Sequence, residues 1–188
     1  MKKQNNLKTW HSINLISDRY FLNQEKKYNY NTIEKFIRAS NKICDHQFDF
    51  LGINNKYFGE NIAWHEDIKS GHIWNFKFYN SYSEKELMPG NGIEIKIPWE
   101  LNRLHHFVTL AQTWRLTKNA KYSDELFSEW IDWSSSNPFG YGINWTSTIE
   151  VSIRSLNLLV AMDLMTDAKG WSKIEKSLIN SIREHGHF

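Results

Sequence analysis

The 188-residue chain has a single cysteine, Cys44, so no disulfide can form within it, and the redox compartment stays undetermined. Its 23 basic and 21 acidic side chains leave a net charge of +2, which lacks the basic excess of nucleic-acid-binding proteins. The longest apolar runs, such as LNLLVAMDLM, are much shorter than a membrane span. We therefore expect neither a nucleic-acid partner nor a transmembrane segment.

The N-terminal stretch MKKQNNLKTWHSINLISDRYF begins with basic residues but lacks the continuous apolar segment of a secretion signal. The default expectation is a cytoplasmic protein, or a periplasmic one if the natural chain carries a leader that is missing here. The sequence also has no phosphate-binding loop and no nucleophile elbow. His105 and His106 are adjacent and point apart on a helix, so we expect no metal site and no cofactor.

Aromatic residues are dense, with 9 Trp, 8 Tyr and 11 Phe. Most of them are expected in the core, because a tryptophan supplies much buried area per residue. The remainder would be available along a cleft, where aromatic rings can stack on sugar rings.

The texture of the chain changes near Pro98, although no linker divides it. Before this point, apolar spacing predicts a helix over 31–44, and residues 46–95 show no sustained helical period. Several glycines and the Asn54-Asn55 pair predict short strands and ordered loops there. A loop-rich segment of this length often serves binding.

Residues 97–188 predict two helical hairpins. The first would have one helix over 98–114, with Pro98 in its first turn, and a return helix that starts at Ser123 and stops at Asn137-Pro138. In the second, Ser147 and Glu150 predict a capping box before a very apolar helix, and a further helix would open at Ser172.

The hairpins resemble a repeat, because Arg103 and Arg154 occupy similar places in them at a period of roughly 50 residues, typical of paired-helix arrays. Two hairpins leave apolar faces that further hairpins would cover. We therefore predict a mainly α fold, an incomplete (α/α) toroid in which 1–96 form a helix plus a loop-rich, short-strand segment. The uncovered face would favour self-association.

Five blocks, in this order, resemble the N-terminal domain of the heparinase II/III-like polysaccharide lyases. They are HQFDFLG (46–52), WHEDIKSGHIW (64–74), PWELNRLHHF (98–107), NPFGYGINWTSTIEVSIRSLN (137–157) and REHGHF (183–188). The resemblance implies an (α/α) toroid followed by a β-sandwich domain, of which residues 1–188 hold only the N-terminal part of the toroid. It also implies cleavage of a uronic-acid polysaccharide, such as heparan sulfate or alginate, by β-elimination.

In that reaction a base removes the C5 proton, an acid protonates the leaving oxygen, and a polar group offsets the carboxylate charge. The family's Asn that serves the carboxylate, and its catalytic Tyr and further His, would follow Phe188. The resemblance therefore implies that this chain lacks the complete catalytic centre and contributes substrate-binding residues.

The candidates for binding an anionic polysaccharide cluster near predicted helix starts and in the loop segment. They are Trp99, Asn102, Arg103, His106, Asn144, Trp145, Glu150, Arg154, His65 and Lys69. Glu150 and Arg154 are four apart, so they either form an ion pair that orders the cleft wall, or Arg154 meets a carboxylate or sulfate. Trp145 either staples the helix or stacks on a sugar.

Two of the candidates lie in the loop segment. His65 either pairs with Asp67 to shape a loop or flanks an acidic polymer together with Lys69.

Three functions remain open. The first is a polysaccharide lyase, and the alternative is a module that binds glycan without cutting it. A glycoside hydrolase would need two carboxylates across a cleft, and Glu100 and Glu150 both have simpler capping or pairing roles.

Overall fold

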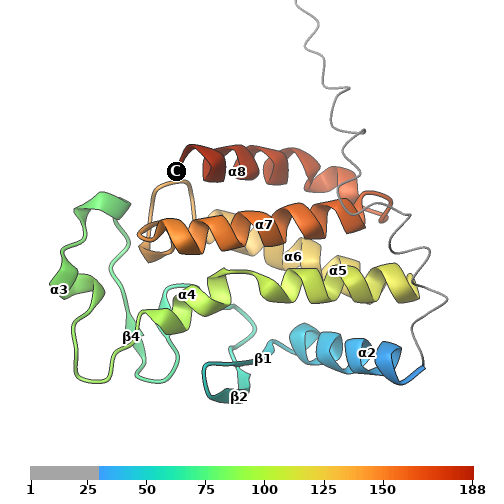
Figure 1. Cartoon of the computed structure of the whole chain (residues 1–188), viewed down its shortest axis with the longest axis horizontal. Coiled ribbons are helices and arrows are strands. Elements are labelled where there is room, and N and C mark those ends of the chain that lie inside the picture. Colours follow the sequence, from blue (N-terminus) through green and yellow to red (C-terminus); the bar gives the residue numbers. More distant parts are fainter. Residues whose placement is uncertain (1–29) are drawn as a thin grey trace, which may run out of the picture.

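Four helices lie one above another in a single stack, with a fifth behind them (Figure 1). A computed structural model describes residues 30–188, so the segment inspected for a secretion signal, residues 1–21, lies outside the described part. From bottom to top the stack consists of α2 (Tyr30–Cys44), α5 (His105–Thr117), α7 (Thr148–Met165) and α8 (Glu175–His187), and α6 (Ala120–Ser136) packs against α5 and α2. The predicted mainly α class is confirmed; closure of a toroid stays a prediction.

The segment between α2 and α4 (Lys96–Asn102) contains short strands and ordered turns, as its glycines predicted. Strand β1 (Gln47–Phe50) pairs antiparallel with β2 (Ile53–Tyr57), and β3 (Glu66–Asp67) pairs antiparallel with β4 (His72–Ile73). The 3-10 turn η2 (Tyr79–Ser81) and the short helix α3 (Glu84–Leu87) follow. The Asp67 carboxylate anchors this segment, because it accepts hydrogen bonds from Lys69 N (2.9 Å), Ser70 Oγ (2.6 Å) and Glu94 N (3.0 Å).

The single helix predicted over 98–114 was wrong, because the chain forms two helices there. Helix α4 (Lys96–Asn102) ends at Arg103, and α5 begins at His105. Between them Leu104 adopts a left-handed backbone (φ 58°, ψ 35°), which is unfavourable for a residue with a branched side chain. Its side chain is fully buried, so apolar packing holds the break in place.

The break leaves backbone carbonyls without helical partners, and helix α7 supplies donors for them. Asn157 Nδ2 donates to Arg103 O at 2.8 Å, and Arg154 Nη1 donates to Asn102 O at 3.3 Å. The interruption of one helix is thus satisfied by side chains of its neighbour.

The predicted helix starts also differ in detail. Helix α6 begins at Ala120 with Asn119 as its cap, whose side chain accepts from Lys121 N at 3.0 Å, so Ser123 lies inside the helix. The predicted capping box of Ser147 and Glu150 was wrong: Ser147 precedes α7 at the cap position, but its side chain makes no capping hydrogen bond, and the Glu150 carboxylate is bonded to Arg103. A 3-10 turn, η4 (Trp171–Lys173), precedes α8.

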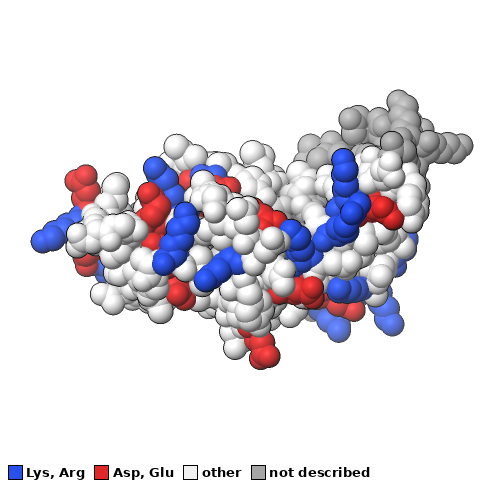
Figure 2. Space-filling model, turned by 90° about the horizontal axis from the view of Figure 1, so that it is seen from below, with Lys and Arg blue, Asp and Glu red and all other residues white. Residues whose placement is uncertain are grey.

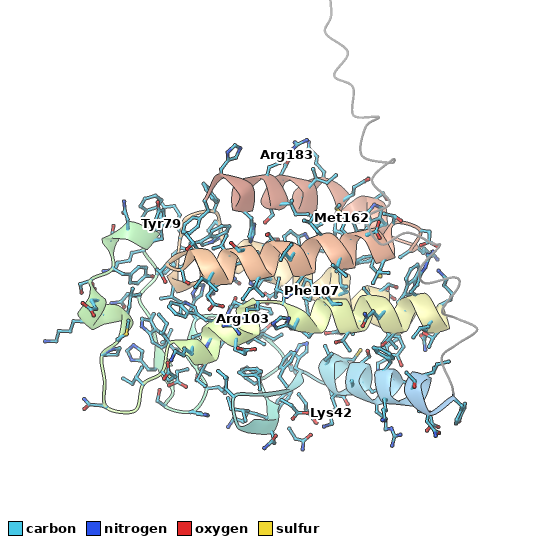
Figure 3. All side chains as sticks on the ribbon, viewed as in Figure 1. Lys42, Tyr79, Arg103, Phe107, Met162 and Arg183 are labelled. Atoms are coloured by element: carbon cyan, nitrogen blue, oxygen red, sulfur yellow. The ribbon has the colours of Figure 1, made fainter. Side chains whose placement is uncertain are left out.

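Tryptophans dominate the core. Trp64, Trp130, Trp133 and Trp145 are all at most 2% exposed and belong to one cluster with the central Phe107 (Figure 3). Burial of rings of this size contributes a large share of the apolar area that drives folding. This agrees with the expectation that most aromatic residues are structural.

Acidic and basic side chains are interspersed on the face seen in Figure 2, with no extended patch of one sign. Within residues 30–188, no helix combines the length and the apolarity required to cross a bilayer.

Candidate functional site

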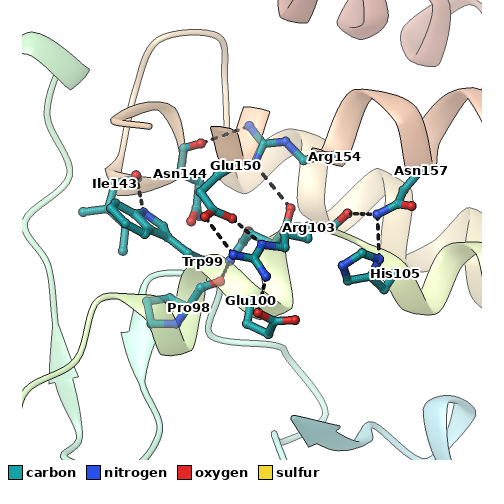
Figure 4. A network of polar contacts seen from close by, with 11 residues as sticks. Pro98, Trp99, Glu100, Arg103, His105, Ile143, Asn144, Glu150, Arg154 and Asn157 are labelled. Atoms are coloured by element: carbon teal, nitrogen blue, oxygen red, sulfur yellow. Dashed lines mark hydrogen bonds and ion pairs between the residues drawn. The ribbon is translucent and has the colours of Figure 1, made fainter. Parts of the chain in front are cut away.

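Arg103 is the centre of a charged network at the junction of α4 and α7 (Figure 4). Its Nε donates to Glu150 Oε2 at 2.5 Å, and its Nη2 donates to Glu150 Oε1 at 2.9 Å, so the pair is bidentate. Its Nη1 donates to the Glu100 carboxylate. The hydrogen bond to Glu150 raises the pKa of Arg103, whose side chain is 24% exposed. One cation therefore faces two carboxylates near the surface.

Arg154 lies deeper, as a buried cation bound by neutral groups. Its Nε donates to His185 Nε2 at 2.8 Å and its Nη2 to Asn144 O at 2.9 Å, in addition to the bond with Asn102 O. The guanidinium also lies about 5 Å from the ring centres of Trp133 (4.9 Å) and Trp145 (5.0 Å). Burial lowers the pKa of Arg154 to about 9.

The predicted Glu150–Arg154 ion pair was wrong, because Glu150 makes its ion pair with Arg103 instead. Helix α7 places the two side chains in different layers: Glu150 meets the end of α4, and Arg154 reaches α8 through His185. Arg154 is fully buried, so in this structure it orders the interior wall.

The two predicted asparagines are buried connectors. Asn102 Nδ2 donates to Trp64 O (2.8 Å) and Pro98 O (2.7 Å), and its Oδ1 accepts from Trp133 Nε1 (2.7 Å). Asn144 Nδ2 also donates to Trp64 O, at 3.1 Å. Both amides therefore converge on one backbone carbonyl and tie the loop segment to the helices.

Three of the other predicted residues are bonded to groups within the fold, and the fourth is exposed. Trp99 Nε1 donates to Ile143 O at 3.0 Å, and buried His106 Nε2 donates to Glu129 Oε2 at 2.8 Å. His65 Nε2 is bonded to Ser136 O at 3.0 Å, so the predicted pairing with Asp67 was wrong. Exposed Lys69 donates to Leu51 O at 3.0 Å. Whether any of these residues contacts substrate stays a prediction.

A cavity of about 270 Å³ opens between α2, β1 and the α4–α5 junction. Lys42, Asp49, Glu100, His105 and His106 supply polar groups to its wall, alongside apolar residues such as Phe48. Lys42 and Asp49 neutralise each other through a contact of 3.1 Å. The cavity thus brings the predicted residue His106 together with Lys42 of α2 and Asp49 of β1.

An aromatic surface lies beside the predicted residues, and consists of Phe76, Phe78, Phe139 and Tyr141, each at least 40% exposed. The rings of Phe76 and Tyr141 are stacked at 5.9 Å, and those of Phe78 and Tyr141 meet edge to face at 5.5 Å. Backbone hydrogen bonds from Tyr79 N to Gly140 O (2.8 Å) and from Gly142 N to Lys77 O (2.9 Å) hold the two segments together.

The predicted residues support this aromatic surface from beneath. Trp145 meets Phe139 edge to face at 5.1 Å, and His65 meets Phe76 at 5.7 Å. Sequence reasoning therefore found the layer below the exposed rings but missed the rings themselves. A usable signal was present, because alternate residues of an extended segment, such as Phe76 and Phe78, share one face.

A second polar cluster joins the turn after α2 to α6. Ligand atoms of His46, Glu125 and Glu129 all lie within 4.8 Å of one another. The hydrogen bond to Glu125 raises the pKa of His46 to about 9, and burial raises the pKa of Glu129. Sequence analysis did not predict this cluster, because His46 is 79 residues from Glu125 along the chain.

Comparison with known proteins identifies the family. No curated protein and no solved structure matches the chain. A family model described as the heparinase II/III N-terminus matches residues 2–187, which is almost the whole sequence and includes the five sequence blocks except for Phe188. The chain therefore belongs to the heparinase II/III N-terminal family, and with it to a family of polysaccharide lyases.

Proposed function

We propose that this chain is the substrate-binding N-terminal portion of a lyase that cleaves a uronic-acid polysaccharide, heparan-sulfate-like or alginate-like, by β-elimination. The observation that carries the proposal is the family match over residues 2–187. We expect the chain alone to bind the polymer without cleaving it.

The aromatic surface gives the proposal a physical basis. A single exposed aromatic ring is common on protein surfaces. A group of exposed rings held rigidly together is typical of a binding site, because a ligand that covers the group removes its apolar surface from water. The flat faces of Phe76 and Tyr141 would receive the apolar faces of sugar rings. Lys77 lies between Phe76 and Phe78 in sequence. Its ammonium donates to Glu86 Oε1 at 2.6 Å, so it would have to leave Glu86 to meet a uronate carboxylate.

The buried network serves this surface as a support. Trp145 and His65 touch its rings, and Arg154 and Asn144 hold Trp145 and its loop in place. A rigid platform loses little conformational entropy on binding, which raises affinity.

A titration of the purified chain with heparan sulfate, alginate and neutral dextran tests the proposal. We expect binding of at least one uronate polymer and none of dextran. Phe76→Ala and Tyr141→Ala should each weaken binding about fivefold or more, as expected for the loss of about 1 kcal/mol of ring contact. Tyr57→Ala, which removes an exposed ring on β2, is the matched control and should bind like the wild type.

Cleavage is followed separately, through the ultraviolet absorbance of the unsaturated uronate product. A protein that includes this chain and its catalytic segment should produce that absorbance. Binding by such a protein with no product from any uronate would favour the alternative, a non-catalytic glycan-binding module. Absence of binding to every uronate, or equal losses in Tyr57→Ala and Tyr141→Ala, would contradict the proposed role of the aromatic surface.

A further inference from the structure

His46, Glu125 and Glu129 converge from two separate parts of the fold. Glu125 and Glu129 are four residues apart on α6, so they project from one face of the helix. His46 lies in the turn between α2 and β1, and its Nε2 lies 3.0 Å from Glu125 Oε1. The His46 and Glu125 side chains are each 20% exposed, so the cluster is accessible from solvent.

The surroundings orient all of these groups. His46 Nδ1 lies 2.7 Å from Gly59 O, and since a carbonyl oxygen only accepts, Nδ1 carries the proton. Nε2 points toward the carboxylates and donates its own proton to Glu125 Oε1, and a bound ion would take the place of that proton. His106 Nε2 donates to Glu129 Oε2 and fixes the rotation of that carboxylate. Histidine and carboxylate ligands of metals are ordinarily positioned by such outer hydrogen bonds.

Glu129 supplies an independent observation. Its side chain is 3% exposed, and its Oε1 has no hydrogen-bond partner among the described residues. A buried carboxylate oxygen without a partner costs substantial free energy. A proton on His46 Nε2 gives Glu125 a hydrogen-bond donor, but it leaves Glu129 Oε1 without one. A cation bound between the three side chains would satisfy all of them.

We propose that His46, Glu125 and Glu129 form a binding site for a divalent transition-metal ion, with Zn²⁺ as the best-matched probe. One imidazole nitrogen and two carboxylate oxygens are ligands that Zn²⁺ accepts, and three protein ligands leave a coordination position open to solvent. The bound ion links the α2–β1 turn to α6, so it fastens the loop-rich segment to the first helical hairpin. This site is separate from the aromatic surface and does not depend on the proposed glycan binding.

The test is a calorimetric titration of the EDTA-treated chain of 188 residues with ZnCl₂, with MgCl₂ as the hard-cation comparison. We expect one Zn²⁺ per chain, no comparable Mg²⁺ binding, and a melting temperature raised by about 5 °C or more at saturating Zn²⁺. His46→Gln, Glu125→Gln and Glu129→Gln should each weaken Zn²⁺ binding at least tenfold. His187→Gln alters an exposed residue on α8, outside the cluster, and should leave binding unchanged.

Circular dichroism of the metal-free variants separates loss of the site from loss of the fold. If Glu129→Gln or His46→Gln fails to fold, Glu125→Gln decides the test, because its side chain is partly exposed. The proposal is overturned if the wild type binds no stoichiometric Zn²⁺, or if Glu125→Gln binds as tightly as the wild type. A loss in His187→Gln equal to that in Glu125→Gln would equally overturn it, since binding would then be unspecific.

Discussion

Arg103 at the end of α4 and Glu150 in the first turn of α7 form a two-pronged ion pair, with N–O distances of 2.5 and 2.9 Å. The pair joins two segments that are 47 residues apart in sequence. It also takes Glu150 away from the capping role that its spacing from Ser147 had predicted. Because Glu150 is buried and Arg103 is partly exposed, the pair is shielded more than a surface ion pair but less than a core one.

Glu150→Gln should lower the free energy of unfolding by about 1–3 kcal/mol, because Arg103 then retains only Glu100 as a charged partner. Urea unfolding at pH 7 measures the change. A double-mutant cycle with Arg103→Gln should give a coupling energy of about 1 kcal/mol or more. Glu60→Gln, which alters an exposed carboxylate, is the control, and a coupling near zero would show that the contact contributes nothing.

Arg154→Met should destabilise the protein by about 3–5 kcal/mol, because it leaves three buried acceptors without their donor. These are Asn102 O, Asn144 O and His185 Nε2. Arg154→Lys should recover only part of the loss, since an ammonium cannot reproduce the planar contacts with Trp133 and Trp145. Equilibrium denaturation of both variants tests this, and a loss below about 1 kcal/mol in Arg154→Met would contradict it.

Stability should fall as the pH is lowered from about 6.5 toward 3. His185 donates from Nδ1 to Ser181 O and accepts from Arg154 at Nε2, so the neutral ring is the form that fits. Burial first, and then the Arg154 charge, lower the pKa of His185 to about 3. The unfolded chain therefore binds one more proton than the folded chain in this window, and the stabilisation is fully present above pH 6.5.

The measurement is the free energy of unfolding of the wild type and His185→Gln between pH 7 and 4.5. His185→Gln should be less stable at pH 7 but lose less stability on acidification, because the titrating ring is gone. Partly buried His65, whose pKa is also lowered by burial, contributes in the same direction, so the slope should shrink and not vanish. Parallel pH profiles for the two proteins would be the contrary result.

Gly142→Ala should cost several times more stability than Gly71→Ala. Both glycines have a positive φ (86° and 76°), so each substitution carries a backbone cost of about 1 kcal/mol. At Gly142 an added Cβ would also lie 2.4 Å from His65 Cε1, while at Gly71 it meets no atom within 4 Å. Thermal unfolding compares the two variants, and equal shifts in melting temperature would refute the steric argument.

The family was predictable from the five sequence blocks, and the mainly α class and the hairpin positions were predictable because apolar spacing and turn residues act locally. The break at Leu104 was not, since leucine favours a helix and only its burial forces a left-handed backbone there. This break also explains why Arg103 and Arg154, which look equivalent in the sequence, lie at a partly exposed helix end and in the deep interior.

The sequence predicted which segment forms the candidate site, but not which of its residues are buried and which are exposed. Asn144 and Trp145 are where the loop was expected, yet both are buried, and the exposed rings beside them come from another segment. The link between Tyr141 and Phe78 depends on one isolated bridge between segments 63 residues apart, for which the sequence carries no local signal. The meeting of His46 with Glu125 has the same origin in long-range packing.

Leu104, with its left-handed backbone, divides the helical stretch predicted over 98–114 into two helices, and a rotation of one about its axis is not passed on to the other. In a continuous helix, deletion of one residue rotates everything beyond it by about 100°. Here such a deletion within Lys96–Asn102 would reorient that short piece alone, because the joint at Leu104 absorbs the rotation. Such a deletion would still break the bonds of Trp99 with Ile143 O and of Arg103 with Glu150, so its cost would fall on these contacts and not on the packing of His105–Thr117.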